Sequence, residues 1–346
     1  MNKNDVTAAI DDRAISRVQL KFLAMAEGFF ESRILFSINK LGVFRFLGEE
    51  TKSLAAIATE VDARPDTLAR LLNAGVALKL LESDGNANYR LNPEWRPVLV
   101  DELSESYLGN WLNLLDYLSS SLTDLDQAAA KGGPTLNYLA AKDKKDIREF
   151  TLAMHNYAAL RGKELVKFLD TCDCDTLLDL GTGPGTYAFH LGIANPELEL
   201  FLIDLPEVLE VAREVQVRYP LKNNINYLPI DVTQEEIPGS YDMVMVSNTL
   251  HMLGEEESRK LLKRLFSVVK PGGSLVIQFQ YMKDNKLGGR WPCMLDLVQL
   301  CITDEGRNHS VGETRRWMEE AGYSDIKFSA MNLLNTNGYL RGYRKA

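Results

Sequence analysis

The stretch Thr176–Gly185 (TLLDLGTGPG) constrains the fold of this chain more than any other part of its sequence. A short apolar run, typical of a buried strand, reaches the acid Asp179, and glycines follow at positions 181, 183 and 185. Glycine allows a tight turn and a close approach between backbone and ligand, and the N–H groups of a following helix then face that ligand. The stretch therefore predicts a binding loop between a strand and a helix.

The loop alone has competing interpretations. The dinucleotide fingerprint requires Gly or Ala one position after Gly185, where this chain has Thr186. A tight strand-to-helix turn without any ligand would use the same glycines. The run Leu200–Asp204 follows about 20 residues on and again ends in an acid, which is placed to bind a ribose diol if the two strands are parallel.

Four features of the sequence together resemble one family. They are the loop Asp179–Gly185, Asp204 after the second predicted strand, Ile230–Asp231 after the third, and Pro271–Gly273 before a later strand. This combination resembles the class I S-adenosylmethionine-dependent methyltransferases. The resemblance implies S-adenosylmethionine as the cofactor and a Rossmann-like fold.

The second half of the chain alternates apolar runs with helical patterns. Such alternation predicts an α/β fold with a doubly wound sheet, whose ligand lies over the carboxyl ends of the strands. We expect helices at 255–269 and 316–321. The expected strands are 176–180, 200–204, 225–229, 243–246, 274–279, 326–328 and 339–343.

The first half of the chain predicts a helical domain. Residues 13–40 place apolar side chains at helical spacing around more than one face, so we expect helices that intertwine with a second subunit; burial within the same domain is the alternative. Helices at 53–61 and 65–78 and a hairpin around Asp84–Asn88 follow, which is the pattern of a winged helix. A winged helix before a methyltransferase core resembles the small-molecule O-methyltransferases, in which this module mediates dimerisation.

A non-catalytic, metabolite-sensing regulator is the hypothesis from outside the enzymes. It requires DNA binding, but the predicted recognition helix and its end offer only Arg70 and Lys79 as basic residues. The formal net charge of −9 and the pI near 5.2 also argue against a nucleic-acid or anionic-membrane partner. We therefore expect a small-molecule acceptor and a homodimer.

These patterns divide the chain into three predicted parts. Residues 1–103 form the winged-helix dimerisation domain, 104–170 a helical connector that lines the substrate pocket, and 171–346 the donor-binding domain. No apolar run approaches the roughly 20 residues that span a bilayer, and the start of the chain lacks the apolar core of a signal peptide, so a cytoplasmic location is expected. The four cysteines are expected to be reduced thiols, because no second close pair completes a zinc tetrad.

The resemblance also assigns parts of the donor to residues. It implies that the glycine backbone faces the methionine part, Asp179 its amino group, Asp204 the ribose and Asp231 the adenine. The alternative for each acid is a helix cap or a solvated turn. The implied donor site is Asp179, Gly181, Gly183, Gly185, Asp204, Leu205, Asp231, Val232 and Ser247.

His251 follows the fourth predicted strand and is therefore expected at the rim of the pocket. Its ordinary pKa near 6.5 suits removal of a proton from a phenol or enol. The resembling family has its general base here, within Leu-His-Asp-Trp, whereas this chain has Met252 in place of the Asp. We expect an O-methyltransferase that acts on a small aromatic or polyketide-like metabolite, with His251 as general base.

The carboxylates that orient this base in the family are missing here. The corresponding positions hold Phe279, or Gln280 if the register shifts by one, and Asn308. His309 is the other predicted catalytic residue, placed to pair with His251 across the acceptor, and a surface-loop position is its alternative. Two neutral imidazoles are ordinary ligands for zinc or iron. The second enzymatic hypothesis is therefore C-methylation of an activated carbon acid such as an α-keto acid, assisted by a metal at these histidines.

Four residues are predicted to contact the acceptor. The resemblance places Met154 of the connector against the donor, and the neighbouring His155 is either a pocket residue or a structural one. Tyr281–Leu297 is rich in aromatic and sulfur-containing side chains, which suit the wall of an apolar pocket or a core. The predicted acceptor site is Met154, His155, Met294 and Asn308.

Overall fold

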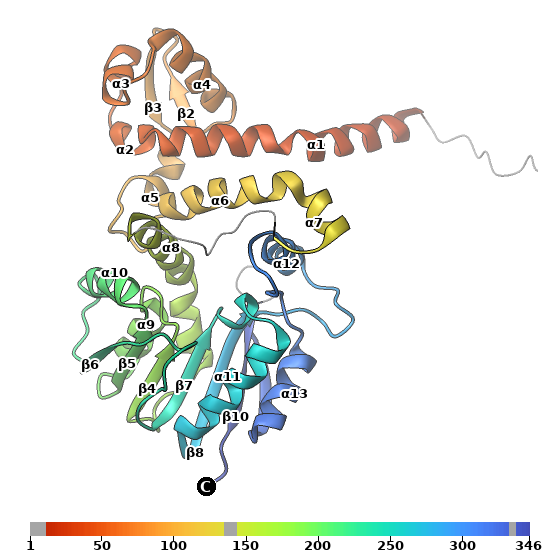
Figure 1. Ribbon diagram of the computed structural model, residues 1–346. Helices are drawn as coiled ribbons and strands as arrows, with labels where there is room; N and C mark the ends of the chain where they lie inside the picture. Colours follow the sequence, from red (N-terminus) through yellow and green to blue (C-terminus); the bar gives the residue numbers. More distant parts are fainter. Residues whose placement is uncertain (1–11, 135–143, 332–336) are drawn as a thin grey trace, which may run out of the picture. The chain divides into compact units, whose positions relative to one another are not determined.

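The computed structural model describes residues 12–134, 144–331 and 337–346. The chain forms two compact units, Met1–Ser104 and Glu105–Ala346, whose elements are labelled in Figure 1. No helix in these described ranges is long and apolar enough to cross a membrane. The cysteines at 172, 174, 293 and 301 are all free, in agreement with the expected thiols.

The first unit is mainly helical and carries a three-stranded sheet in the order β1-β3-β2. Ser53 caps α3 by accepting a hydrogen bond from the Ala56 N–H at 3.2 Å, and Pro65 occupies the first turn of α4, where its missing N–H has no partner to lose. The description of this unit as a winged helix stays a prediction. Its elements are α1 (Asp12–Lys40), α2 (Val43–Leu47), β1 (Lys52–Ser53), α3 (Leu54–Glu60), α4 (Pro65–Ala77), β2 (Leu81–Ser83), β3 (Asn88–Leu91), η1 (Pro93–Trp95) and α5 (Arg96–Leu99).

Helix α1 buries only its C-terminal end within this unit. Phe36 and Ile38 are buried and Ile34 and Leu35 are half-buried, whereas the large apolar side chains up to Phe30 are exposed. The alternative in which the whole helix is buried within its own domain is therefore wrong. The side chains of Ile15, Val18, Leu20, Phe22, Leu23, Met25, Phe29 and Phe30 are 40% to 74% exposed.

The second unit contains a seven-stranded sheet in the order β6-β5-β4-β7-β8-β10-β9. The strands from β6 to β8 pair in parallel, and β10 pairs antiparallel with both β8 and β9. This confirms the predicted α/β fold with a doubly wound, Rossmann-like sheet. The strands are β4 (Thr176–Leu180), β5 (Glu199–Asp204), β6 (Ile225–Pro229), β7 (Tyr241–Ser247), β8 (Val269–Gln280), β9 (Ser324–Met331) and β10 (Asn337–Tyr343).

Helices cover both faces of this sheet (Figure 1). Successive residues of a strand face opposite sides, so Leu177 packs in the core beneath α8, α9 and α10, and Leu178 packs in the core beneath α11 and α13. A smaller apolar cluster joins α6, α7, α8 and α12. These helices are α6 (Gly109–Ser121), α7 (Leu125–Lys131), α8 (Lys144–Phe168), α9 (Thr186–Ala194), α10 (Pro206–Gln216), α11 (Glu255–Val268), α12 (Arg290–Ile302) and α13 (Val311–Ala321), with the 3-10 turns η2 (Leu122–Asp124) and η3 (Leu250–Met252).

The chain order reverses between β4 and β7. From β4 the chain passes to β5 and β6 on one side, and it then continues to β7 and β8 on the other. At such a switch point the loops from the carboxyl ends of neighbouring strands diverge and leave a crevice for a ligand. The glycine loop follows β4 and the turn with His251 follows β7, so both lie at this point.

Gly162 of α8 packs so closely against α9 that a Cβ at this position would clash with the His190 ring. We expect Gly162→Ala to lower the free energy of unfolding by about 1–3 kcal/mol, the usual cost of overpacking, as measured by urea denaturation. Combination with His190→Ala should recover part of this loss, because the clashing ring is then absent. Fully additive effects of the two substitutions would contradict this account of the packing.

Candidate active site

The glycine loop after β4 has a backbone conformation that requires its glycines. Gly181, Gly183 and Gly185 have φ angles of +64°, +55° and +74°, which other residues rarely adopt. A Cβ on Gly185 would lie 2.5 Å from the Phe189 ring, whereas one on Gly183 would meet nothing within 4 Å. Gly185 is therefore required for packing at the start of α9, and Gly183 borders open space.

The carboxylate of Asp204, the last residue of β5, holds this loop. It accepts a hydrogen bond from the Gly183 N–H at Oδ2 and one from the Leu205 N–H at Oδ1, both at 2.8 Å. The Gly181 N–H donates to the Ile203 carbonyl at 2.9 Å. Burial raises the pKa of Asp204, and the two backbone hydrogen bonds oppose that rise. Each carboxylate oxygen retains a lone pair that can accept from a ligand hydroxyl.

Asp179 is a buried carboxyl group with one unused oxygen. It is 2% exposed, and its Oδ2 accepts a hydrogen bond from the Thr182 hydroxyl at 2.7 Å. Its Oδ1 has no hydrogen-bond partner among the residues that the structure describes. Burial raises the pKa of Asp179 to about 7. The Thr182 hydrogen bond opposes this rise, and the negative charge of Asp204 adds to it. A buried acid without a cation favours a ligand that brings a positive group.

The other predicted donor residues lie at or after the ends of β5, β6 and β7. Asp231 Oδ1 accepts hydrogen bonds from the hydroxyl and the N–H of Thr233, at 2.7 and 2.9 Å, and both lower its pKa. These hydrogen bonds are typical of a turn residue, and the contact of Asp231 with the adenine stays a prediction. Leu205 is 42% exposed, Val232 is half-buried, and the Ser247 hydroxyl is buried without a partner in the described part of the chain.

The structure decides which residue at the end of β8 faces the α8 side of the sheet. Phe279 packs in the opposite core, beneath α11 and α13. Gln280 donates from Nε2 to the Tyr157 hydroxyl of α8, and its Oε1 is buried without a partner among the described residues. Gln280 and Phe279 therefore point to opposite sides of the sheet, because neighbouring residues of a strand face opposite sides. The polar side chain that β8 presents to α8 at its carboxyl end is thus an uncharged amide.

A buried amide network supports the start of the turn that carries His251. Asn248, directly after β7, has a φ of +51°, and its Nδ2 and N–H donate to the Oε1 and carbonyl of Gln278, at 2.9 and 2.8 Å. Gln278 Nε2 donates in turn to Asn337 Oδ1 at 2.6 Å. No motif in the sequence predicts this network, although the alternation Gln-Phe-Gln in β8 signals polar groups on one buried face.

His251 lies in η3, the 3-10 turn that follows β7, and it is half-buried. Its Nδ1 is buried without a hydrogen-bond partner among the described residues. Burial lowers the pKa of His251 to about 4, and the nearby His309 lowers it further. The imidazole is therefore neutral at neutral pH and able to accept a proton.

His309 holds the turn that carries His251. It is 3% exposed, so the surface-loop alternative is wrong. Its Nε2 lies 3.1 Å from the Leu250 carbonyl oxygen and 3.2 Å from that of Leu253, and because a carbonyl oxygen only accepts, this nitrogen donates. The ring packs edge-on against Trp317, with centroids 4.8 Å apart. Among the described residues, no group of three or more His, Cys, Asp or Glu side chains is placed to hold a metal ion.

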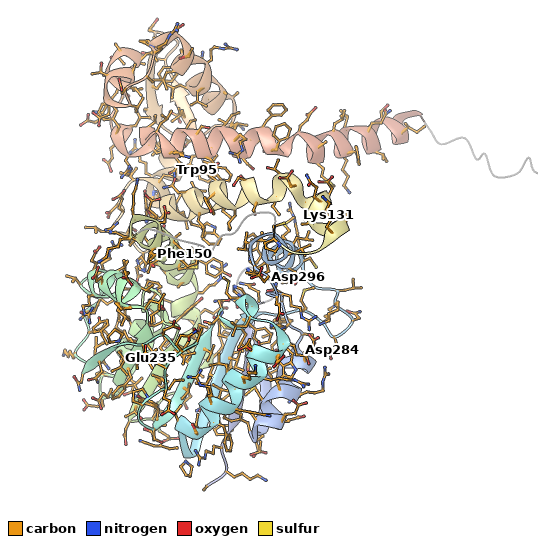
Figure 2. All side chains as sticks on the ribbon, viewed as in Figure 1. Trp95, Lys131, Phe150, Glu235, Asp284 and Asp296 are labelled. Carbon is orange, nitrogen blue, oxygen red and sulfur yellow. The ribbon has the colours of Figure 1, made fainter. Side chains whose placement is uncertain are left out.

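The residues predicted to contact the acceptor have different environments. Met154 is half-buried against the cluster of α6, α7, α8 and α12, and Met294 of α12 is 41% exposed. Asn308 is buried; its Nδ2 donates to the Pro292 carbonyl and its N–H to Oδ1 of Asp296, which is labelled in Figure 2, both at 2.7 Å. Asn308 therefore anchors α12, and its Oδ1 has no partner within the described residues.

His155 has the surroundings of a structural histidine. It is 1% exposed, and a hydrogen bond of 2.9 Å joins its Nδ1 to the hydroxyl of Thr186, the first residue of α9. Burial lowers the pKa of His155 to about 4, and Arg218 contributes to this shift. These contacts favour the structural interpretation over a pocket residue.

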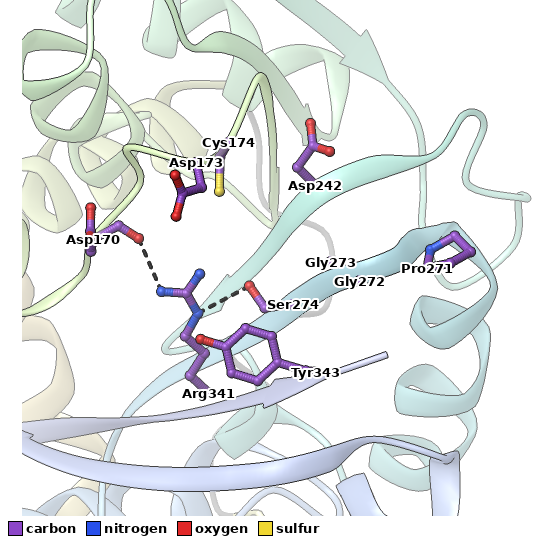
Figure 3. Close-up of a pocket in the computed structure, with 10 residues that line it drawn as sticks. All are labelled: Asp170, Asp173, Cys174, Asp242, Pro271, Gly272, Gly273, Ser274, Arg341 and Tyr343. Atoms are coloured by element: carbon purple, nitrogen blue, oxygen red, sulfur yellow. Dashed lines mark hydrogen bonds between the residues drawn. The ribbon is translucent and has the colours of Figure 1, made fainter. Parts of the chain in front are cut away.

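A hollow at the opposite edge of the sheet is separate from these residues (Figure 3). It lies where β8 begins, beside Gly272 and Ser274, and contains no predicted site residue. Arg341 crosses it and donates to the Asp170 carbonyl at 3.0 Å and to the Ser274 hydroxyl at 3.1 Å. Within this hollow, Arg341 of β10 thus connects β8 to the segment before β4.

Two family models match this chain. The O-methyltransferase domain matches residues 111–324, and the O-methyltransferase dimerisation domain matches residues 23–94. The chain belongs to the O-methyltransferase family. This confirms the family predicted from the glycine loop, the strand-end acids and Pro271–Gly273.

Relatives of this O-methyltransferase extend over nearly the whole chain. It is 27% identical to the tetracenomycin polyketide synthesis 8-O-methyl transferase TcmO of Streptomyces glaucescens, over 90% of this chain and 93% of the relative. It is 24% identical to acetylserotonin O-methyltransferase of Macaca mulatta, over 87% of this chain and 91% of the relative. The crystal structure of human N-acetylserotonin methyltransferase in complex with SAM has the same fold, with a TM-score of 0.84 over 100% of both chains at 21% identity.

Substitution of two loop glycines should separate ligand binding from packing. Both Gly183→Ala and Gly185→Ala place a side chain at positive φ, which costs about 1 kcal/mol or more, but only Gly185→Ala also clashes with Phe189. We expect Gly183→Ala to weaken binding of S-adenosylhomocysteine at least about 10-fold in calorimetry, with the smaller loss of melting temperature. Unchanged affinity in Gly183→Ala would contradict the placement of the ligand at this loop.

Proposed function

We propose that this O-methyltransferase moves a methyl group from S-adenosylmethionine to a hydroxyl of a small aromatic or polyketide-like metabolite, with His251 as general base. The observation that carries the proposal is a neutral, half-buried histidine at the switch point, one strand away from the glycine loop. Methyl transfer from a sulfonium is an in-line displacement, so the protein has to orient the acceptor and remove its proton.

The residues at the ends of β4, β5 and β6 fit S-adenosylmethionine. The unpaired Oδ1 of Asp179 can accept hydrogen bonds from an ammonium group, and Gly183 leaves space beside the loop. The carboxylate of Asp204 has lone pairs left for the ribose hydroxyls, and Leu205 and Val232 offer apolar surface for the adenine. When bound, the cofactor supplies an electrophilic methyl group on a sulfonium centre.

The environment of His251 narrows the class of acceptor. A base with a pKa of about 4 removes a proton well only from a hydroxyl that is itself acidic, or that becomes acidic as the new bond to carbon forms. Phenols and enols meet this condition better than aliphatic alcohols do. The uncharged Gln280 and Asn308 stand at the positions of the family's glutamates, so no ionic partner at these positions stabilises an imidazolium.

The names of relatives support an aromatic acceptor and a hydroxyl as the methylated group. TcmO is named for tetracenomycin polyketide synthesis, and a relative from Streptomyces sahachiroi, 24% identical, is named 3-hydroxy-5-methyl-1-naphthoate 3-O-methyltransferase. The N,N-dimethyltransferase OxyT of Streptomyces rimosus, 25% identical, shows that nitrogen methylation also occurs among the relatives. The metal-assisted C-methylation hypothesis lacks comparable support, because no group of three or more His, Cys, Asp or Glu side chains among the described residues is placed to hold a metal ion.

Replacement of the general base should lower the rate of methyl transfer without changing the affinity for the donor. We expect His251→Ala to bind S-adenosylhomocysteine as tightly as the wild type does and to lower kcat by about 10²-fold or more, the usual contribution of a general base. The acceptor would be identified first, by incubation with labelled donor and a panel of phenols, quinones, enols and keto acids. Unchanged turnover with that acceptor would remove His251 from the mechanism.

The pH dependence provides a second readout of this role. The folded-state pKa of about 4 keeps His251 unprotonated at all higher pH values, so kcat/KM of the wild type should stay level as the pH falls through 6.5. Activity should decline only near the lowered pKa. A decline with its midpoint near 6.5 would show that the base is a histidine with an ordinary environment.

We also propose that the exposed apolar side chains of α1 pack against a second copy of this chain. Eight large apolar residues on one helix exceed what a monomer leaves exposed without reason, and the dimerisation-domain match, which begins at residue 23, includes four of them. We expect replacement of Phe22, Met25 and Phe29 by Glu to give a monomer in sedimentation velocity. Val217→Glu, at an 81% exposed position in the second unit, is the control and should remain dimeric. A dimer in the triple variant would exclude this interface.

A further inference from the structure

Arg161 of α8 is a buried cation that has no anionic partner among the described residues. It is 7% exposed. Its Nη1 donates to the Tyr157 carbonyl one turn earlier at 2.7 Å, and its guanidinium carbon lies 3.5 Å from the centre of the Tyr157 ring. Its Nε is buried without a hydrogen-bond partner, and none of the ion pairs among the described residues includes this side chain.

A buried guanidinium in this state is costly. Burial removes the hydration of the charge, and a cation inside a protein is normally compensated by a paired anion. Arginine cannot escape this cost by losing its proton, because its pKa lies far above the range in which proteins titrate. A stacked ring and one carbonyl satisfy only part of the group, so an anionic ligand is the expected partner.

Arg161 lies on the face of the sheet that α8 covers, and its side chain extends toward the carboxyl ends of the strands, where the donor loop begins. Side chains of a helix point back toward its N-terminus, and Arg161 reaches back to Tyr157, whose hydroxyl accepts from Gln280 at the carboxyl end of β8. Gln280 and Asp179 each stand at or next to the last residue of their strands. Arg161 is therefore directed toward the ligand edge of the sheet.

The Tyr187 hydroxyl of α9 connects this cation with Asp179. Tyr187 is buried, and the side chain of Asn248 interacts with its hydroxyl. Burial raises the pKa of this hydroxyl most, followed by Tyr157; Arg161 and the Asn248 side chain oppose the rise, and Asp179 adds to it. The positive Arg161 and the negative Asp179 thus both act on the same hydroxyl, at the first turn after the glycine loop.

We propose that Arg161 binds the carboxylate of the donor's amino-acid end, while Asp179 binds its ammonium group. The unpaired guanidinium and the unpaired carboxyl oxygen have the charges that complement an α-amino acid. The inference rests on the use of S-adenosylmethionine and not on the acceptor or on His251.

Calorimetry with ligands that differ only in the carboxylate tests this assignment. S-adenosylhomocysteine and its decarboxylated analogue would be titrated into the wild type, Arg161→Gln and Arg161→Lys. We expect Arg161→Gln to weaken binding of S-adenosylhomocysteine by about 10- to 100-fold, as for a lost hydrogen bond between charged groups, and to change binding of the decarboxylated analogue little. Arg161→Lys keeps the charge and should retain part of the preference for the carboxylate.

The control variant removes a similar stacking contact elsewhere. Arg213 of α10 lies with its guanidinium carbon 4.4 Å from the centre of the Tyr227 ring and is exposed, so Arg213→Gln should leave both affinities unchanged. Equal weakening of both ligands in Arg161→Gln would show that Arg161 only supports the fold. A wild type that binds both ligands equally would overturn the role of Arg161 while leaving the donor proposal intact, and no binding of S-adenosylhomocysteine at all would overturn both.

Discussion

The hydrogen bond from the Gly183 N–H to the Asp204 carboxylate, 2.8 Å long, is the contact on which the candidate site depends. It joins the end of β5 to the loop after β4, where alternate glycines hold left-handed conformations that cost conformational entropy to fix. With the loop held by a neighbouring strand, the backbone of Gly183 borders open space and Asp179 stays buried with one oxygen unpaired. The hydrogen bonds that hold the glycine loop in place thus also leave its backbone and the Asp179 oxygen available to a ligand.

Charge is distributed unequally across the site. On the proposed donor side, Asp179, Asp204 and Arg161 are ionisable groups in buried or partly buried positions, and none of them forms an ion pair with another described residue. On the proposed acceptor side, His251, Gln280 and Asn308 are neutral, because burial lowers the pKa of the histidine and the other two side chains are amides. This contrast suits a donor with several charged groups and an uncharged aromatic acceptor.

The four histidines show where inference from the sequence ends. His155 and His190 pack within the helices on one face of the sheet, His309 donates to the backbone of η3, and His251 alone is half-buried at the switch point. A strand followed by a histidine predicted His251 at the pocket rim. The position of His309 depends on the contact between the turn after β7 and the segment before α13, which are far apart in the chain, so no local pattern could distinguish a ligand from a support.

The sequence by itself determined the alternation of strands and helices and the glycine loop with its strand-end acids, because these depend on periodicity and on backbone conformations that only certain residues adopt. The family followed from the resemblance of these motifs to those of known methyltransferases. The tertiary structure decided which side chains share a face. It placed Gln280 rather than Phe279 toward α8 and gave Arg161 a buried position without an anion. The physical reason is that burial and pairing of a polar group depend on neighbours from distant elements, and a single sequence does not specify which elements will be adjacent.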